Sequence, residues 1–109
     1  IENSWICIDF KKHRIIPTNY SIKSFELNQN SAHPKSWVIE ASNDNQNWDL
    51  IDEKKDCPAL NGRNFIHTFK IKNQVHNKYR YIRLRQTKPN WAESNYLMIS
   101  CIEFYGTLI

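Results

Sequence analysis

Apolar and polar residues alternate along several short stretches of this chain. Within Trp5–Phe10, Ile6 and Ile8 fall on one side, while Cys7 and Asp9 fall on the other. Successive side chains of a β-strand point to opposite faces, so a period of two residues predicts a strand rather than a helix. The chain is therefore expected to enter a sheet near its first residues.

The same reasoning predicts six further extended stretches, separated by loops rich in amides, Pro and small residues. No stretch has sustained helical periodicity. Six or seven short strands on about a hundred residues favour an antiparallel β-sandwich in which each sheet has one buried face. The six expected stretches are Ile15–Leu27, Trp37–Ser42, Trp48–Ile51, Phe65–Ile71, Tyr79–Arg85 and Leu97–Tyr105.

The length and composition of the chain indicate that the expected strands belong to one domain, residues 1–109. The chain is 40% hydrophobic and 13% aromatic, which is enough to form a core. No run approaches the roughly 20 apolar residues of a membrane span, and the first residues lack the layout of a signal peptide. We expect a soluble globular domain that is a fragment of a longer protein.

Charge adds little evidence for nucleic acid, because the net charge of +4 comes from basic residues scattered among eleven acidic ones. The exception is Tyr79–Arg85, where aromatic and cationic residues interleave as on a single-strand platform. On a strand, Tyr79, Tyr81, Arg83 and Arg85 share one face, so a solvated outer face with cation–π pairs explains the pattern equally well. We expect no nucleic-acid partner.

Three cysteines are an odd number without a CxxC pair, so the sequence suggests neither a disulfide framework nor a zinc site. A reducing compartment follows as the expectation. Cys7 and Cys101 lie on expected strands and are interpreted as small core residues, whereas Cys57 lies in a polar segment and is expected to be exposed.

Catalytic and metal signatures are missing from the sequence. Gly62 and Gly106 are the only glycines, so there is no phosphate loop or nucleophile elbow, and the four histidines are dispersed. The amides at 43, 45 and 47 have the spacing of a calcium loop but not its carboxylates, which favours a hairpin turn held by side-chain hydrogen bonds. We expect no enzyme, metal or cofactor.

Four segments, in order and spanning almost the whole chain, together resemble the F5/8 type C family, also called discoidin-like. Each also has a physical interpretation: Trp37 and Trp48 can pack across a hairpin, and Ile82, Leu84, Ile102 and Phe104 supply alternating core positions. Gly106 suits a strand exit. The resemblance implies a galactose-binding-like jelly roll. The segments are Trp5–Phe10, Ser36–Asp44 with Trp48 following, Tyr79–Arg85 and Ile99–Gly106.

Two departures from the family pattern refine what the resemblance implies. Members of the family carry further residues ahead of the strand at Trp5, so the sandwich is expected to lack its N-terminal strand or strands. Secreted members are closed by a disulfide between their ends, but no cysteine follows Gly106 here. The chain thus resembles an intracellular branch found beside BTB or ubiquitin-ligase modules, or in ciliary and cytoskeletal assemblies.

The resembled fold places two loops, residues 28–36 and 87–95, at the end of the sandwich that binds ligands in carbohydrate- and lipid-binding members. Their side chains suit a sugar or a peptide, although Trp91 could instead fold back as a lid. The loop tips lack pairs of large aliphatic residues, so no membrane partner is expected. The candidate ligand-binding residues are His33, Lys35, Lys88, Asn90, Trp91 and Glu93.

The function expected from these observations is a non-catalytic binding or scaffolding module for a protein partner or neighbouring subunit. Carbohydrate binding is the alternative, and a preorganised shallow pocket near Trp91 would distinguish it from a flat protein contact. A sandwich short of strands exposes an apolar flank and an unpaired edge, so we expect upstream residues or another subunit to cover them.

Overall fold

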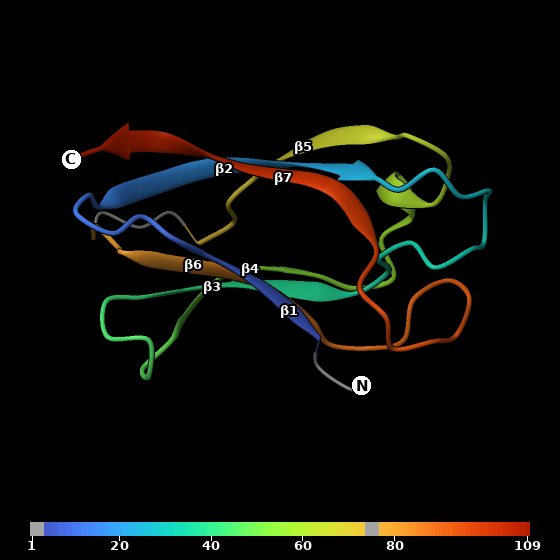
Figure 1. The fold of residues 1–109 in the computed structure, drawn as a ribbon, viewed down its shortest axis with the longest axis horizontal. Coiled ribbons are helices and arrows are strands. Elements are labelled where there is room, and N and C mark those ends of the chain that lie inside the picture. The colour runs from blue at the N-terminus through green and yellow to red at the C-terminus, as the bar shows by residue number, and fades with distance from the viewer. Residues whose placement is uncertain (1–3, 74–76) are drawn as a thin grey trace.

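The computed structural model of the chain describes residues 4–73 and 77–109, and these form a sandwich of two antiparallel sheets (Figure 1). One sheet has the order β1-β6-β3-β4 and the other β5-β2-β7. The expected all-β antiparallel sandwich is confirmed. The elements are β1 Trp5–Asp9, β2 Ile15–Ser24, β3 Trp37–Ser42, β4 Asp49–Lys54, the short 3-10 helix η1 Pro58–Leu60, β5 Ile66–Lys70, β6 Tyr81–Gln86 and β7 Ile99–Leu108. Among the described residues, no helix is long and apolar enough to cross a membrane.

The core lies between the sheets and is built from alternate residues of each strand. Ile82 and Leu84 are fully buried, and Ile102 and Phe104 pack against the core as the alternation predicts. Tyr20 stacks on Phe69, with ring centroids 5.1 Å apart. Burying these side chains supplies the main driving force for closing the sandwich.

One hydrogen-bond network crosses the core at the β4 side. The Tyr20 hydroxyl donates to the Asp52 carboxylate and accepts from Trp37 Nε1 at 3.1 Å. Lys54 Nζ lies 3.0 Å from the same carboxylate, and the Lys72 backbone N–H donates to it at 3.1 Å. A buried carboxylate is tolerated because these partners satisfy it.

The two tryptophans of the β3–β4 hairpin do not pack together, contrary to the sequence interpretation. Trp37 starts β3, pairs with Lys54 and lies in the core. Trp48 precedes β4 at the opposite end of the hairpin, where it lies over Arg83. The hairpin turn is held as expected by side-chain hydrogen bonds, and Asp44 is its centre: its carboxylate accepts from the backbone N–H groups of residues 46 and 47.

Strand β7 continues past Gly106 instead of ending there. Gly106 pairs with Pro17 at an irregularity of the β2–β7 ladder and has a φ of 155°. Pro17 has no N–H to donate, which confines it to such an irregularity within a sheet. A Cβ on residue 106 would overlap the carbonyl oxygen of Ile16, so only glycine fits.

The expected burial is wrong for Cys7 and Cys101, and Cys57 is less exposed than expected. Cys7 and Cys101 are exposed, because they face outward from β1 and β7. Cys57 is half-buried and packs against the core beside η1. All three thiols are free in the structure.

Candidate functional site

The loop that follows β6 is organised by the side chain of Asn90. Its Oδ1 accepts from the backbone N–H groups of Ala92 and Ser94, at 2.9 and 3.1 Å. Its Nδ2 donates to Ser94 Oγ at 2.8 Å and to the Tyr96 carbonyl at 3.0 Å. The Asn90 side chain therefore uses its hydrogen-bonding groups to hold the loop in shape, and they are not available to a ligand.

The loop that follows β2 is held in a similar way by His33, whose side chain is fully buried. His33 Nε2 lies 2.8 Å from the Leu27 carbonyl oxygen and 2.9 Å from that of Asn28, which assigns the proton to this nitrogen. The Trp91 backbone N–H donates to the His33 carbonyl at 3.2 Å and joins the two loops. His33 thus shapes the loop end from inside, which removes it from the surface a ligand could contact.

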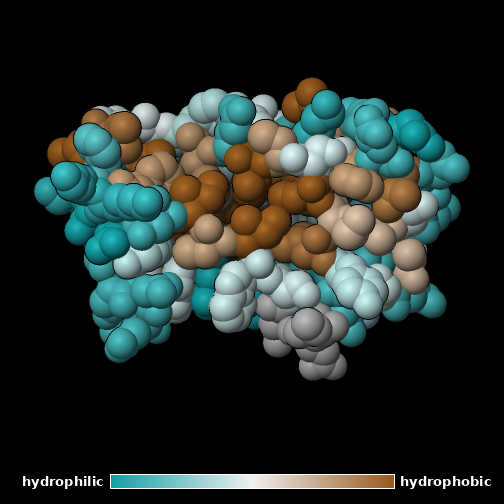
Figure 2. All heavy atoms as spheres, in the orientation of Figure 1, coloured by the Kyte–Doolittle hydropathy of each residue, from teal (hydrophilic) through white to brown (hydrophobic). Residues whose placement is uncertain are grey.

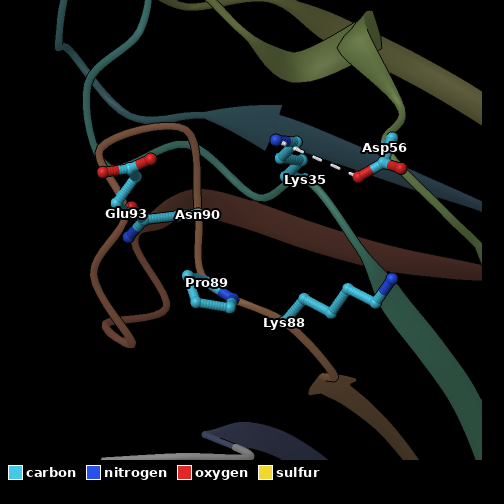
Figure 3. Close-up of a pocket in the computed structure, with 6 residues that line it drawn as sticks. All are labelled: Lys35, Asp56, Lys88, Pro89, Asn90 and Glu93. Atoms are coloured by element: carbon cyan, nitrogen blue, oxygen red, sulfur yellow. Dashed lines mark ion pairs between the residues drawn. The ribbon is translucent and has the colours of Figure 1, made fainter.

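A shallow pocket of about 280 Å³ lies at this loop end (Figure 3). Four of the six residues predicted from sequence line it, namely Lys35, Lys88, Asn90 and Glu93, together with Asp56 and Pro89. Lys35 Nζ lies 4.0 Å from the Asp56 carboxylate. Asp56 reaches the pocket because Cys57 N–H bonds to the Lys35 carbonyl at 2.8 Å, a long-range contact with no signal in the local sequence.

Trp91 folds back instead of facing the pocket. Lys35 Nζ lies 4.6 Å from the centroid of the Trp91 ring, and the indole Nε1 is buried. One face of the indole is therefore occupied by a cation, and its N–H is turned away from solvent. The lid interpretation of Trp91 describes this geometry better than a free stacking platform does.

The outer face of the four-stranded sheet carries the aromatic and cationic residues of β6. The Arg83 guanidinium lies between two indoles, 5.1 Å from Trp5 and 3.9 Å from Trp48. Arg83 and Arg85 both donate to Glu40 Oε1, at 3.0 and 2.9 Å. Burial alone raises the pKa of Glu40, but the hydrogen bonds from Arg85 and Arg83 outweigh it and hold this pKa below its usual value.

These contacts confirm the expected outer face with cation–π pairs. Tyr81, Arg83 and Arg85 share it, whereas Tyr79 precedes the strand and is buried in the core. Because Arg83 is stacked and hydrogen-bonded within the protein, the interleaved pattern has a structural role.

No described strand covers the flank between β1 and β7. Each of these strands has one neighbour, β6 and β2, and no other described strand pairs with them. Ile6 and Ile8 lie opposite the fully buried Leu84 and Ile82, so they point between the sheets, yet they are only half-buried. Figure 2 shows apolar side chains gathered in a band along this side. We define the β1–β7 flank as Ile6, Ile8, Phe10, Ile102 and Phe104.

The opposite flank, between β4 and β5, is closed by the chain itself. Lys54 Nζ reaches over the Phe69 ring at 5.6 Å, and the Asn73 N–H donates to the Ile51 carbonyl at 3.0 Å. The helix η1 contacts β5 and β2 at this side. Within residues 4–73 and 77–109, the sandwich is therefore uncovered along one side, and this asymmetry has no signal in any single strand.

No group of three or more His, Cys, Asp or Glu side chains in residues 4–73 and 77–109 is placed to hold a metal ion.

Residues 1–108 match the family described as Sad1/UNC-like C-terminal. Among curated proteins, none matches the chain. The matching family has a different description from the F5/8 type C family that the sequence resembles. The expected galactose-binding-like fold is confirmed by solved structures, among them CBM32 modules of the discoidin-like kind.

Those structures are carbohydrate-binding modules that share about a fifth of their residues with this chain. CBM32-3 from a family 31 glycoside hydrolase of Clostridium perfringens is 20% identical with a TM-score of 0.68, over 97% of this chain and 69% of that one. CpGH89CBM32-6, produced by Clostridium perfringens, is 19% identical with a TM-score of 0.65, over 98% and 71%. A chitosan-binding module from a chitosanase/glucanase of Paenibacillus sp. IK-5 is 18% identical with a TM-score of 0.62, over 97% and 70%. This similarity shows the fold alone.

Proposed function

The chain belongs to the Sad1/UNC-like C-terminal family, and from this premise we propose that it is a non-catalytic protein-binding module. The observation that carries the proposal is the β1–β7 flank. There, the inward-facing residues of two strands are half-buried, while their neighbours on β6 and β2 are fully buried. The partner is an extended polypeptide segment that lies along this flank.

The chemistry of the flank defines that segment. Both β1 and β7 have an edge free of described strand partners, and such an edge offers backbone N–H and C=O groups for strand addition. Between the edges, Ile8 and Phe104 present apolar surface. A bound strand that alternates apolar and polar residues would form hydrogen bonds with the backbone groups of the edge, and its apolar side chains would cover that surface.

An intracellular setting, in a scaffold of the adaptor or cytoskeletal kind, is part of this proposal. Its support is the exposed thiols of Cys7 and Cys101, which face solvent on two different sheets. Free exposed thiols persist in a reducing compartment and are oxidised in secreted proteins.

Hydrogen exchange of the backbone amides tests the proposal. We expect the amides of β1 and β7 to exchange more slowly in the protein's native assembly than in the isolated chain. The matched control is β4, which is also an edge strand but lies on the closed flank. Equal exchange of β1 and β7 in the two samples would contradict the proposal.

Carbohydrate binding at the loop end is the alternative, and its geometry there is weaker. The pocket of about 280 Å³ falls below the roughly 300–1,000 Å³ of typical ligand sites. Its candidate aromatic residue, Trp91, is covered by Lys35. The lining of this pocket therefore offers charge and amides but no aromatic ring on which a sugar could stack.

A further inference from the structure

A larger pocket, of about 380 Å³, lies on the outer face of the three-stranded sheet, away from the core. The ladder registers explain how its side chains meet. Ser21 of β2 lies between Thr68 of β5 and Glu103 of β7, and in the next row Lys23 lies between Ile66 and Cys101. Tyr105, two residues after Glu103, and Ile22, between Ser21 and Lys23, also line the pocket.

The hollow follows from the sizes of these side chains. Ser21 and Thr68 are short and lie opposite each other, and Cys101 in the next row is also short, whereas Lys23, Glu103 and Tyr105 beside them are long. Ser21 Oγ and Thr68 Oγ1 lie 2.7 Å apart and hold the two hydroxyls in place. A sheet face that would otherwise be flat thus has a preformed depression with a polar floor.

The side chains around the depression combine directional polar groups with an open ring. The Tyr105 hydroxyl donates to Glu103 Oε2 at 2.9 Å, so the carboxylate is oriented but keeps acceptor sites for other donors. Lys23 adds a donor, and each hydroxyl of the floor can donate or accept. The Tyr105 side chain is 42% exposed, which leaves ring surface for stacking.

A carbohydrate matches this combination, because a sugar ring has hydroxyl groups around its edge and C–H groups on its faces. The hydroxyls can donate to Glu103 and accept from Lys23, while the C–H face packs on Tyr105. A purely apolar ligand would offer nothing to the remaining acceptor sites of Glu103 or to the Lys23 ammonium group, and a nucleic acid would place phosphates beside the Glu103 carboxylate.

We propose that the outer face of the β5-β2-β7 sheet is a binding site for a short, neutral oligosaccharide. This site is distinct from the loop end and from the β1–β7 flank. It leaves the flank free, so a protein partner and a glycan could be held at the same time.

Cys101 in the floor of the pocket provides a direct test. The rate at which a maleimide labels Cys101 is measured in the folded protein, with and without chito-, cello- and galacto-tetraose. Cys7, which is exposed on the other sheet, serves as the internal control. At a concentration of the bound sugar ten times its Kd, labelling of Cys101 should slow about tenfold, and labelling of Cys7 should not change.

Three variants locate the effect. Tyr105→Ala and Glu103→Gln should abolish the protection of Cys101, whereas Trp91→Ala at the loop end should leave it intact. Thr107→Ala, on the same strand but outside the pocket, is the matched control, and an unchanged urea midpoint shows that each variant remains folded. The proposal is overturned if no sugar of the panel protects Cys101, or if protection persists in Tyr105→Ala and Glu103→Gln.

Discussion

Asp52 is a buried carboxylate that ties β4 to the rest of the core. It accepts from Tyr20, Lys54 and the backbone of Lys72. We expect Asp52→Ala to lower the free energy of unfolding by about 3 kcal/mol, because it leaves several partners without an acceptor and Lys54 without its counter-ion. Urea denaturation measures this. Glu53→Ala, an exposed neighbour on β4, should change the midpoint little, and an Asp52→Ala midpoint equal to that of Glu53→Ala would contradict the prediction.

Tyr20 makes stability depend on pH in the alkaline range. Burial and the hydrogen bond to Asp52 raise the pKa of Tyr20 above its usual value. Above about pH 10 the unfolded chain loses the phenol proton and the folded chain keeps it, so stability falls with rising pH by up to about 1.4 kcal/mol per unit. Below about pH 10 the phenol is protonated in both states, so the contribution of Tyr20 to the free energy of unfolding is fully present.

Tyr20→Phe should therefore flatten the decline in stability between pH 10 and 12. The exposed Tyr96 is the matched control, since Tyr96→Phe should leave the slope as it is in the unmodified protein. Chemical denaturation at each pH measures both. A slope that is the same in Tyr20→Phe and in the unmodified protein would show that another group causes the alkaline loss.

The thiols should label in an order set by their burial. Cys101 and Cys7 are exposed and should react with a maleimide in the folded protein, Cys7 more slowly than a free thiol because burial raises its pKa. Cys57 packs against the core and should react only on unfolding. Without reductant, all three should label after denaturation. Mass spectrometry counts the labels, and fewer than three would indicate a disulfide.

The positions of these cysteines could be predicted in part. The alternation in β1 places Cys7 with Asp9 and opposite Ile6, so the outward orientation was present in the pattern. A general preference of free cysteine for the interior led to the opposite expectation. The burial of Asp52 had no such signal, because it depends on Tyr20 and Lys72, which lie far from it along the chain.

At the scale of elements, the strands were predictable because alternation is a local property, while their ends were not. The strand that was expected to end at Tyr105 extends to Leu108, because Gly106 pairs with Pro17. Pro17 lies near the opposite end of the chain. Likewise, β4 continues to Lys54, where it pairs with Trp37. Pairing across the sheet, which local sequence does not encode, decided where each strand stops.

Gly106→Ala tests the pairing of β7 with β2. The added methyl would overlap the Ile16 carbonyl, so the two strands must separate locally or the ladder must shift. We expect a loss of about 2–3 kcal/mol in the free energy of unfolding. Thr107→Ala, the next residue on the same strand, should cost far less. Equal unfolding midpoints for the two variants would show that the bulge at Pro17 absorbs the methyl group.

At the scale of the whole molecule, an open sandwich side follows from the topology rather than from any one strand. The four-stranded sheet ends on β1 and the three-stranded sheet ends on β7, and both ends face the same side (Figure 1). An uncovered flank was expected because a sandwich short of strands exposes apolar surface and an unpaired edge, and the structure identifies the residues of such a flank. The pocket on the outer face of β5-β2-β7 was not foreseen, since it depends on the register of three strands.

The uncovered flank should make the isolated 109-residue chain associate with itself. Apolar surface between two unpaired edges favours contact with another copy, so sedimentation should show a weight-average mass that rises with concentration. Ile102→Lys places a charge on the β1–β7 flank and should suppress the association, at some cost in stability. Ile66→Lys changes an isoleucine on the outer face of β5 and should leave the association as it is. A monodisperse monomer with a cooperative, highly stable unfolding transition would show that the flank needs no cover, and the protein-binding proposal would then lose the observation that carries it.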